Sequence, residues 1–325
     1  MTMTNKPATA TIILNWRSPD DTIACVNHVL ESKYDNNKIY IFDNESSEES
    51  YEILTGSLEG VVILRSPTNL GYAGGNNAAI RQAVTDGADY VWLLNSDAIV
   101  APHTLASLVD YAESHRDGGI VSPIIYETPE KTAVQYAVRT FDKRTGMYHD
   151  INEIDKAMEW QNTNKGTGLV VGTAMLISRI AIERVGLLDE RYFAYWEDMD
   201  YSMRAIKCGL ATGTDFNSWI IHARKPAITK PHTYYFSARN YFLFARKFFP
   251  GTKRLRAILY HLRESFRTLE KIQDHRPQAD ALILGLWHGL LGITGPHTPR
   301  RQPPRPLAAL LRTQPSLFRK IVDAL

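Results

Sequence analysis

Cysteine is nearly absent from this 325-residue chain, which contains only Cys25 and Cys208. Two isolated thiols exclude a disulfide framework and a cysteine metal cluster, and they are typical of a reducing compartment. No stretch reaches the roughly 18 consecutive apolar residues that a membrane-spanning helix requires. The first ten residues, MTMTNKPATA, lack the apolar core of a signal peptide. We therefore expect a protein that is made and kept in the cytosol.

A strong overall charge is also lacking, because the net charge is only +2. Its distribution is uneven: residues 251–325 contain 13 Lys and Arg against 5 Asp and Glu, a net charge of +8. Residues 1–250 therefore carry a net charge of −6. An acidic body and a basic C-terminal segment suggest a different partner for each part. The composition, 44% hydrophobic and 22% charged, is that of a globular protein and argues against disorder.

Strand and helix patterns alternate over the first hundred residues. Runs rich in β-branched residues, such as ATIILNW, are followed by segments with helical spacing, such as DDTIACVNHVLES. This βαβα order predicts an α/β fold, a parallel sheet with helices on both faces. The expected strands are 10–16, 38–44, 60–66 and 90–97, and the helices between them are 20–32, 46–56 and 77–87.

The rest of the chain is less regular. Residues 128–165 are polar and poorly periodic, so we expect a variable insert there. The segment 257–272 places its apolar residues on one helical face, 280–295 is apolar but interrupted by glycine, and 296–306 is typical of an extended linker. The further expected elements are strands at 118–127, 168–179 and 218–222, and helices at 180–186, within 192–209 and at 233–249. We expect one domain at 1–250, with halves at about 9–100 and 101–250, and a basic helical extension at 251–325.

Polar residues end the predicted parallel strands. In such sheets, ligands bind at the carboxyl ends of the strands. Any one Asn or Asp there is explained as a turn residue, whereas four strand ends at the same edge favour a shared ligand. The residues concerned are Asn15, Asp43, Asn44, Asn69, Asn95, Ser96 and Asp97.

Glycine is concentrated in NLGYAGGNNAA at 69–79. Gly71, Gly74 and Gly75 permit close backbone approach, and Asn76 and Asn77 offer caps to the helix that follows. Such a loop can hold a phosphate at a helix N-terminus. It matches neither the dinucleotide GxGxxG nor the P-loop pattern. The alternative is a flexible loop whose glycines serve turns.

Two groups of acidic residues carry further chemistry. Asp97, at the end of a strand, is a suitable ligand for a hard divalent cation that would screen a diphosphate; the alternative is an Asx-turn. In YWEDMDYSMR, Glu197, Asp198 and Asp200 lie within four residues, and a carboxylate there suits a general base. The alternative is acidic charge at a helix N-terminus. The neighbouring aromatic residues, which would form a stacking wall for a sugar, are Tyr192, Phe193, Tyr195 and Trp196.

The motifs ILNW, FDNESS, NLGYAGGNNAAI, WLLNSDAIV, VGTAMLISRIAIERVGLLDERYFAYWEDMDYSMRAIKCG and SWIIH occur in the order and spacing of one family. Across roughly residues 9–250 the chain resembles family 2 glycosyltransferases of the GT-A fold, and within them the rhamnosyltransferase-type branch. The resemblance implies the GT-A form of the α/β fold, a Rossmann-like and mostly parallel sheet. In that family the first half binds a nucleotide-diphosphate sugar, and the metal motif is often Asp-x-Asp, with Asn common at its first position in this branch. Asn95 stands there in this chain, so Asp97 would contact the metal.

The resemblance implies roles for particular residues. Asp198, in a Glu-Asp pair with Glu197, would be the catalytic base, and Asp43 would face the nucleobase or ribose. His222 matches a histidine near the metal and phosphates, although ARKPAITK follows it where relatives have small residues, and a structural strand-end histidine is the alternative. Arg239 in SARNYF would meet phosphate or tie its helix to the sheet. The implied donor-binding set is Asn15, Asp43, Asn44, Gly71, Tyr72, Gly74, Asn76, Asn77, Asn95, Ser96 and Asp97; the acceptor-binding set is Tyr195, Trp196, Asp200 and Thr173; and the metal ligands are Asp97 and His222.

The implied reaction is an inverting hexosyl transfer from a nucleotide-diphosphate sugar, with dTDP-rhamnose as one candidate, to a hydroxyl of a glycan or lipid-linked acceptor in cell-surface polysaccharide synthesis. It would require Mg²⁺ or Mn²⁺. A nucleotidyltransferase is the enzymatic alternative, although NWRSPDD lacks the glycines of its activation loop. A non-catalytic nucleotide-sugar or carbohydrate-binding module is the other. The basic extension would contact an anionic membrane surface on its cytosolic side, or else cap the domain or form a homodimer. Nucleic acid is not an expected partner, because the basic residues are scattered among apolar ones.

Overall fold

The computed structural model describes residues 6–114, 119–223, 229–297 and 302–324. Contacts divide the chain into two compact units. The first, the sheet unit, comprises Met1–Thr140, His149–Leu188 and Asp198–Arg224. The second, the helical unit, comprises Phe141–Tyr148, Asp189–Glu197 and Lys225–Leu325.

A nine-stranded sheet forms the centre of the sheet unit, in the order β3-β2-β1-β4-β10-β6-β11-β5, with β7 paired to β6. The first four strands in this order up to β4 are parallel, and β6 and β11 are parallel to each other. β10, β5 and β7 run antiparallel to their neighbours. The strands are β1 (Thr9–Asn15), β2 (Asn37–Asn44), β3 (Val62–Ser66), β4 (Tyr90–Asn95), β5 (Ala98–Val100), β6 (Ile120–Tyr126), β7 (Val134–Tyr136), β10 (Ala174–Ser178) and β11 (Thr212–His222).

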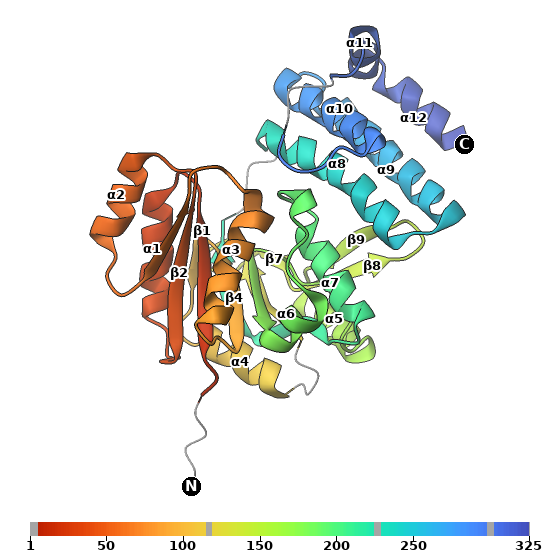
Figure 1. Cartoon of the computed structure of the whole chain (residues 1–325). Helices are drawn as coiled ribbons and strands as arrows, with labels where there is room; N and C mark the ends of the chain where they lie inside the picture. Colours follow the sequence, from red (N-terminus) through yellow and green to blue (C-terminus); the bar gives the residue numbers. More distant parts are fainter. Residues whose placement is uncertain (1–5, 115–118, 224–228, 298–301, 325) are drawn as a thin grey trace. The chain divides into compact units, whose positions relative to one another are not determined.

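Helices cover both faces of this sheet, as the alternating pattern predicts (Figure 1). In β1, Ile13 packs into one apolar core and Ile12 into the other, since successive side chains of a strand point to opposite faces. The first core receives α1 (Pro19–Leu30), α2 (Glu48–Ser57) and α4 (Thr104–Ser114). The second receives α3 (Gly71–Thr85), α6 (Arg179–Val185) and α7 (Glu197–Lys207). The α/β class and the first seven elements are confirmed to within a few residues, except for the start of α3.

The glycine-rich segment is not a loop. α3 begins at Gly71, so the expected helix at 77–87 begins six residues too late. A Cβ at Gly75 would lie 2.5 Å from Leu14 Cδ1 and 3.2 Å from the Phe42 ring. Glycine is therefore present because the helix approaches the sheet closely, while Gly71 itself adopts φ +73° at the turn into the helix.

The insert expected at 128–165 contains regular elements that its weak periodicity does not predict. They are β7, the two-stranded sheet of β8 (Val138–Asp142) and β9 (Met147–Ile151), and α5 (Ile154–Thr163). Each is short, so its periodicity is weak in the sequence, but Ala137, Val138 and Ala157 are buried together in a small core.

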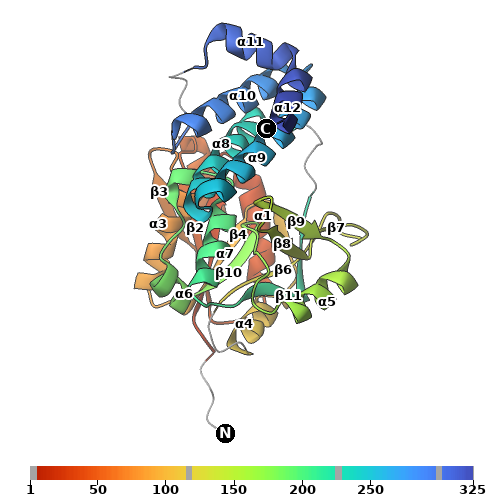
Figure 2. The same ribbon diagram turned by 90° about the vertical axis from the view of Figure 1, so that its right-hand side faces the viewer.

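The helical unit contains α8 (Pro231–Phe248), α9 (Gly251–Ile272), α10 (Arg276–Leu291), α11 (Arg305–Thr313) and α12 (Pro315–Ala324), with the short 3₁₀ helix η1 (Glu190–Tyr192). Figure 2 shows these helices together, and an apolar core joins α8, α9 and α10. α11 begins at Arg305, inside the expected linker at 296–306, so the predicted end of that linker is two residues too late; its residues 298–301 fall outside the described residues. Within the described residues, no helix is both long and apolar enough to span a bilayer.

The helical unit begins earlier along the chain than the boundary expected at residue 250. α8 belongs to it because α8 packs closely along α10, where a Cβ at Gly285 would lie 2.4 Å from the Tyr235 carbonyl oxygen. The glycines of α10 therefore serve helix packing, and Gly292 ends the helix in the left-handed conformation.

Candidate active site

The first part of the site lies where β1 and β2 end. Asn15 and Asp43 are paired in register, and Asn15 Nδ2 donates to Asp43 Oδ1 at 2.8 Å. Asn15 Nδ2 also lies 3.0 Å from Ser46 Oγ, and its Oδ1 accepts from Thr22 Oγ1 at 2.9 Å. Arg65 Nε lies 3.3 Å from Asp43 Oδ2. Asn15 and Asp43 are fully buried, and this network holds them rigidly at the edge of the sheet.

A cavity of about 550 Å³ lies beside this network. It is lined by the residues that follow β1 and β2, among them Arg17, Ser46 and Ser47. Arg17 and Glu45 have positive φ values of 59° and 65°. The cavity lies at the carboxyl ends of the strands, where the sequence predicts the donor nucleotide.

Asn44 holds the start of α3. Its Oδ1 accepts from the Leu70 amide at 2.8 Å, and its Nδ2 donates to the Gly71 carbonyl at 3.1 Å. Asn76 and Asn77 are inside α3 and nearly fully buried, so the expectation that they cap the helix is wrong. Asn77 instead exchanges two hydrogen bonds with the Leu188 backbone, at 2.9 and 3.0 Å.

The second part of the site is formed by the turn after β4. Asp97 Oδ1 lies 3.2 Å from His222 Nε2, and Asn95 Nδ2 lies 3.3 Å from the same nitrogen. His222 ends β11 and is distant in sequence, so the sheet brings these three residues together. The other ring nitrogen, Nδ1, lies 2.9 Å from Gln135 Oε1.

This arrangement fits a divalent cation. With Nδ1–H donating to Gln135, His222 Nε2 carries a lone pair that faces the Asp97 carboxylate. An imidazole lone pair and a carboxylate oxygen at this distance are typical of metal ligands, and the Gln135 contact resembles the outer hydrogen bond that orients such a histidine. The Asp97 side chain is 43% exposed, so a ligand can reach it. The described residues contain no group of three or more His, Cys, Asp or Glu side chains that could hold a metal, so a diphosphate would have to complete the coordination.

The third part of the site is Asp198 on the first turn of α7. Asp198 Oδ2 accepts from the Gly172 amide at 3.0 Å, and the Gly172 carbonyl accepts from the Tyr72 hydroxyl. The next carbonyl, of Thr173, accepts from the Asn95 amide at 2.9 Å. Two adjacent residues thus connect the candidate base to the end of β4.

The remaining residues of the acidic and aromatic group have structural contacts. Asp200 is fully buried and pairs with Arg204 at 2.6 Å, which explains its charge without an acceptor. Glu197 is also buried. Trp196 is only 8% exposed, and its ring lies 5.1 Å from the Tyr241 ring centroid. The expected open stacking wall is therefore wrong for Trp196, because other aromatic rings enclose it; Tyr195 is partly exposed, with its hydroxyl 3.0 Å from Thr233 Oγ1.

The sequence gives no signal for several residues that hold the site. Gln135 lies in the polar insert, and its role depends on a contact with a histidine 87 residues away. Arg65 follows an ordinary strand pattern, and Gly172 resembles any small strand residue. Only the sheet topology reveals what they contact.

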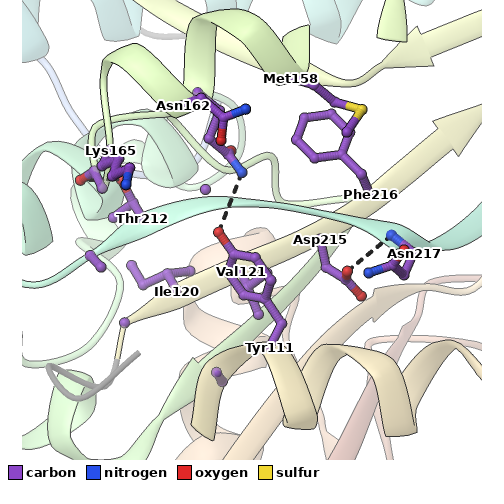
Figure 3. A pocket seen from close by; sticks show the side chains of 16 residues that line it. Tyr111, Ile120, Val121, Met158, Asn162, Lys165, Thr212, Asp215, Phe216 and Asn217 are labelled. Carbon is purple, nitrogen blue, oxygen red and sulfur yellow. Dashed lines mark hydrogen bonds between the residues drawn. The ribbon is translucent and has the colours of Figure 1, made fainter. Parts of the chain in front are cut away.

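A second cavity, of about 580 Å³, lies at the opposite end of the sheet, near the first residues of β6 and β11 (Figure 3). Side chains from α5 and β11 line it, including Met158 and Phe216. Its polar groups bond to one another: Gln161 Nε2 lies 3.3 Å from the Tyr111 hydroxyl, and Asp215 accepts from the Asn217 amide. It is not at the edge of the sheet where ligands bind.

Comparisons with known proteins agree with the motifs. The family model for Glycosyl transferase family 2 matches residues 11–186. The chain is 25% identical over 303 residues to the low-salt glycan biosynthesis hexosyltransferase Agl10 of Haloferax volcanii, covering 87% of this chain and 91% of that protein. It is 21% identical over 278 residues to the dTDP-rhamnosyl transferase RfbF of Shigella flexneri, covering 82% and 90%.

A solved structure is also similar, the mannosyltransferase PcManGT from Pyrobaculum calidifontis in complex with GDP-Man and Mn²⁺. The TM-score is 0.56 at 17% identity, over 99% of this chain and 83% of that chain. At this identity the likeness concerns the fold alone, and it confirms the expected fold class.

Proposed function

This chain belongs to glycosyltransferase family 2, and from that premise we propose that it is an inverting, metal-dependent hexosyltransferase. It would transfer a sugar from a nucleotide-diphosphate donor, with dTDP-rhamnose as one candidate, to a hydroxyl of a glycan or lipid-linked acceptor. One observation carries the proposal. Asp97 and Asn95 both lie beside His222. The backbone of residues 172–173 in turn connects Asn95 to Asp198 by hydrogen bonds.

Different residues of the sheet unit would bind the nucleoside and the metal. The network of Asn15 and Asp43, beside the cavity of about 550 Å³, would bind the nucleoside. Asp97 and His222 would hold Mg²⁺ or Mn²⁺, which neutralises charge on a diphosphate leaving group. Thr173 remains a proposed acceptor contact, as does Tyr195, which belongs to the helical unit; Asp200 is withdrawn from that role because of its buried ion pair.

Asp198 would act as the general base. Its carboxylate takes the proton of the acceptor hydroxyl, whose oxygen forms a bond to the anomeric carbon from the face opposite the nucleotide. The bond between that carbon and the diphosphate oxygen breaks, and the nucleoside diphosphate leaves with the electron pair. The Gly172 amide fixes one carboxylate oxygen of Asp198, which would keep the base oriented.

Donor turnover tests the proposal. UDP-, dTDP- and GDP-sugars are first ranked by thermal shift with Mn²⁺, since a ligand that binds the native state raises the melting temperature. The best donor is then incubated with candidate hydroxyl acceptors, and release of nucleoside diphosphate is measured with Mn²⁺ and with EDTA. We expect release only with metal. Donor binding without release or transfer would instead favour the non-catalytic binding module, whereas the family match decides against the nucleotidyltransferase.

We also propose that the helical unit contacts the cytosolic face of an anionic membrane. Leu255 is 58% exposed among the cations of the first turns of α9, and Leu290 and Leu291 are each 51% exposed at the end of α10. Arg246 donates to the Leu290 carbonyl at 3.0 Å, so these features share one end of the unit. Exposed leucines beside arginine and lysine suit a lipid surface with anionic headgroups.

Vesicle co-sedimentation of the full chain tests this contact. The double variant Lys253→Glu, Arg256→Glu should lose binding to anionic vesicles, and Lys33→Glu, Lys165→Glu, which changes the net charge equally in the sheet unit, should keep it. Binding of the wild type should fall as salt rises. If the wild type stays in the supernatant at low salt, the membrane contact is wrong, and size-exclusion chromatography then tests a homodimer through the same surface.

A further inference from the structure

The backbone leading into Glu197 and Asp198 has an unusual conformation. Phe193, Tyr195 and Trp196 adopt positive φ values of 66°, 68° and 75°. Bulky side chains disfavour this left-handed region, and residues persist there only where their surroundings hold them. Glycine or asparagine would allow the same turn with less strain. Strain that is retained at three residues next to a candidate base is a reason to look for a function.

Asn240 holds this segment from α8. Its side-chain Nδ2 lies 2.9, 2.7 and 2.6 Å from the carbonyl oxygens of Tyr192, Ala194 and Tyr195, which share its two N–H groups. Asn240 is fully buried. One amide group therefore fixes the carbonyl directions of Tyr195, which is strained, and of Tyr192 and Ala194, which flank the strained Phe193.

Arg239 supports Asn240. Its Nε donates to Asn240 Oδ1 at 2.8 Å, which sets the orientation of the amide. Its Nη2 donates to the Tyr192 carbonyl at 2.7 Å, and its Nη1 to the Gly295 carbonyl. Arg239 is 2% exposed, and burial lowers the pKa of its guanidinium from the ordinary value. Burying a charge costs free energy unless hydrogen bonds of good geometry compensate for the lost water, so the guanidinium is held where these carbonyls accept from it.

Other residues of α8 fix the ends of the same segment. Lys247 Nζ lies 2.8 Å from Asp189 Oδ2, and Thr233 Oγ1 lies 3.0 Å from the Tyr195 hydroxyl. Positions 233, 240 and 247 are seven residues apart and share one face of the helix. One stripe of α8 thus holds residues 189–195 from start to end.

We propose that Asn240 and Arg239 are positioning residues for glycosyl transfer: they hold residues 192–196 in the strained conformation and so set the direction in which the chain enters α7 at Glu197 and Asp198. The inference rests on the proposed function, because it takes Asp198 as the base. It replaces the expectation that Arg239 meets phosphate, since its guanidinium is committed to carbonyl oxygens within the helical unit.

The test compares Asn240→Ala with Leu282→Ala. Leu282 is buried in the core of the helical unit, so its replacement lowers stability without removing a bond to the segment. We expect Asn240→Ala to lower kcat about tenfold or more per folded molecule with an unchanged donor KM, because misplacement of a catalytic group slows the chemical step. Leu282→Ala should keep kcat. Arg239→Lys, which keeps the charge but not the fork of donors, should give a smaller loss and serves if Asn240→Ala fails to fold.

Amide hydrogen exchange of the peptide 189–198 separates this inference from the proposed function. Exchange should rise about tenfold in Asn240→Ala relative to Leu282→Ala, because the bonds that hold the carbonyls are lost. If the wild type transfers no sugar, the proposed function is wrong. Faster exchange in Asn240→Ala alone would then still show that Asn240 holds residues 192–196, but not that it does so for catalysis. Equal exchange and equal kcat per folded molecule in the two variants would overturn the inference.

Discussion

The sheet unit buries polar side chains inside helices, as at Asn77, and also at strand ends, and the strand ends distinguish it from the helical unit. In the sheet unit, Asn15 and Asp43 lie at strand ends, beside a cavity. In the helical unit, Arg239, Asn240 and His261 lie in the middle of helices and bond mainly to backbone carbonyls. Polar groups at a sheet edge can receive a ligand, whereas polar groups inside a helix bundle fix the chain. From this comparison we assign ligand binding and catalysis to the sheet unit, and the positioning of residues 192–196 to the helical unit.

The largest expected effect tests the chemistry. Asp198→Asn should lower kcat by about 10²-fold or more, the scale of a lost general base, with little change in donor affinity. Stopped assays at saturating donor, with donor affinity from calorimetry, measure both quantities. Glu197→Gln is the control, because Glu197 is buried while Asp198 is partly exposed. A comparable loss in Glu197→Gln with an active Asp198→Asn would transfer the role of base to Glu197.

A pair of glycine substitutions tests how closely α8 and α10 pack in the helical unit. Gly285→Ala should lower the free energy of unfolding by about 1–3 kcal/mol, because the new Cβ would meet the Tyr235 carbonyl oxygen at 2.4 Å. Gly56→Ala on α2 meets nothing within 4 Å and should raise it by up to about 1 kcal/mol. Thermal unfolding measures both. Effects of the same sign would contradict the close packing of α8 and α10.

A smaller effect concerns pH and the helical unit. His261 is buried, its Nε2 lies 3.0 Å from the Ala238 carbonyl, and burial lowers its pKa from 6.5 to about 4. Between these values the unfolded chain binds a proton that the folded chain does not, so stability falls as the pH falls. From pH 7.5 to pH 5 the loss from this group is about 2 kcal/mol at 1.36 kcal/mol per pKa unit.

Urea unfolding of the wild type and His261→Gln at the two pH values isolates this contribution. The wild type should lose more stability than the variant on acidification. Equal losses would show that His261 takes up its proton in the folded state as readily as in the unfolded chain.

Much of the sheet unit is readable from the sequence. The alternation of apolar strands and amphipathic helices is local, so the α/β class and the polar strand ends follow from it. The start of α3 is predicted wrongly because glycine occurs both in loops and where a helix packs closely against a sheet. The pattern NLGYAGGNN is typical of a loop, but Gly75 is required by the approach of Leu14 and Phe42.

Contacts between distant segments explain what is not readable. His222 is proposed from a family motif, but Gln135, which orients it, lies in a segment without a motif. The strained conformations of Tyr195 and Trp196 oppose the preferences of those residues, so no local rule predicts them. They are held by Asn240, which is distant in the chain.

The most direct test of the central claim is metal-dependent binding at Asp97 and His222. Calorimetry would follow the nucleoside diphosphate that gives the largest thermal shift, with Mn²⁺ and with EDTA, in the wild type, Asp97→Asn and His222→Gln. We predict that Mn²⁺ tightens binding to the wild type by about tenfold or more, as expected when a cation bridges carboxylate and diphosphate oxygens. Both variants should lose this gain while keeping the wild-type melting temperature. Binding that is equal in Mn²⁺ and EDTA, or a full metal effect in Asp97→Asn, would contradict the account.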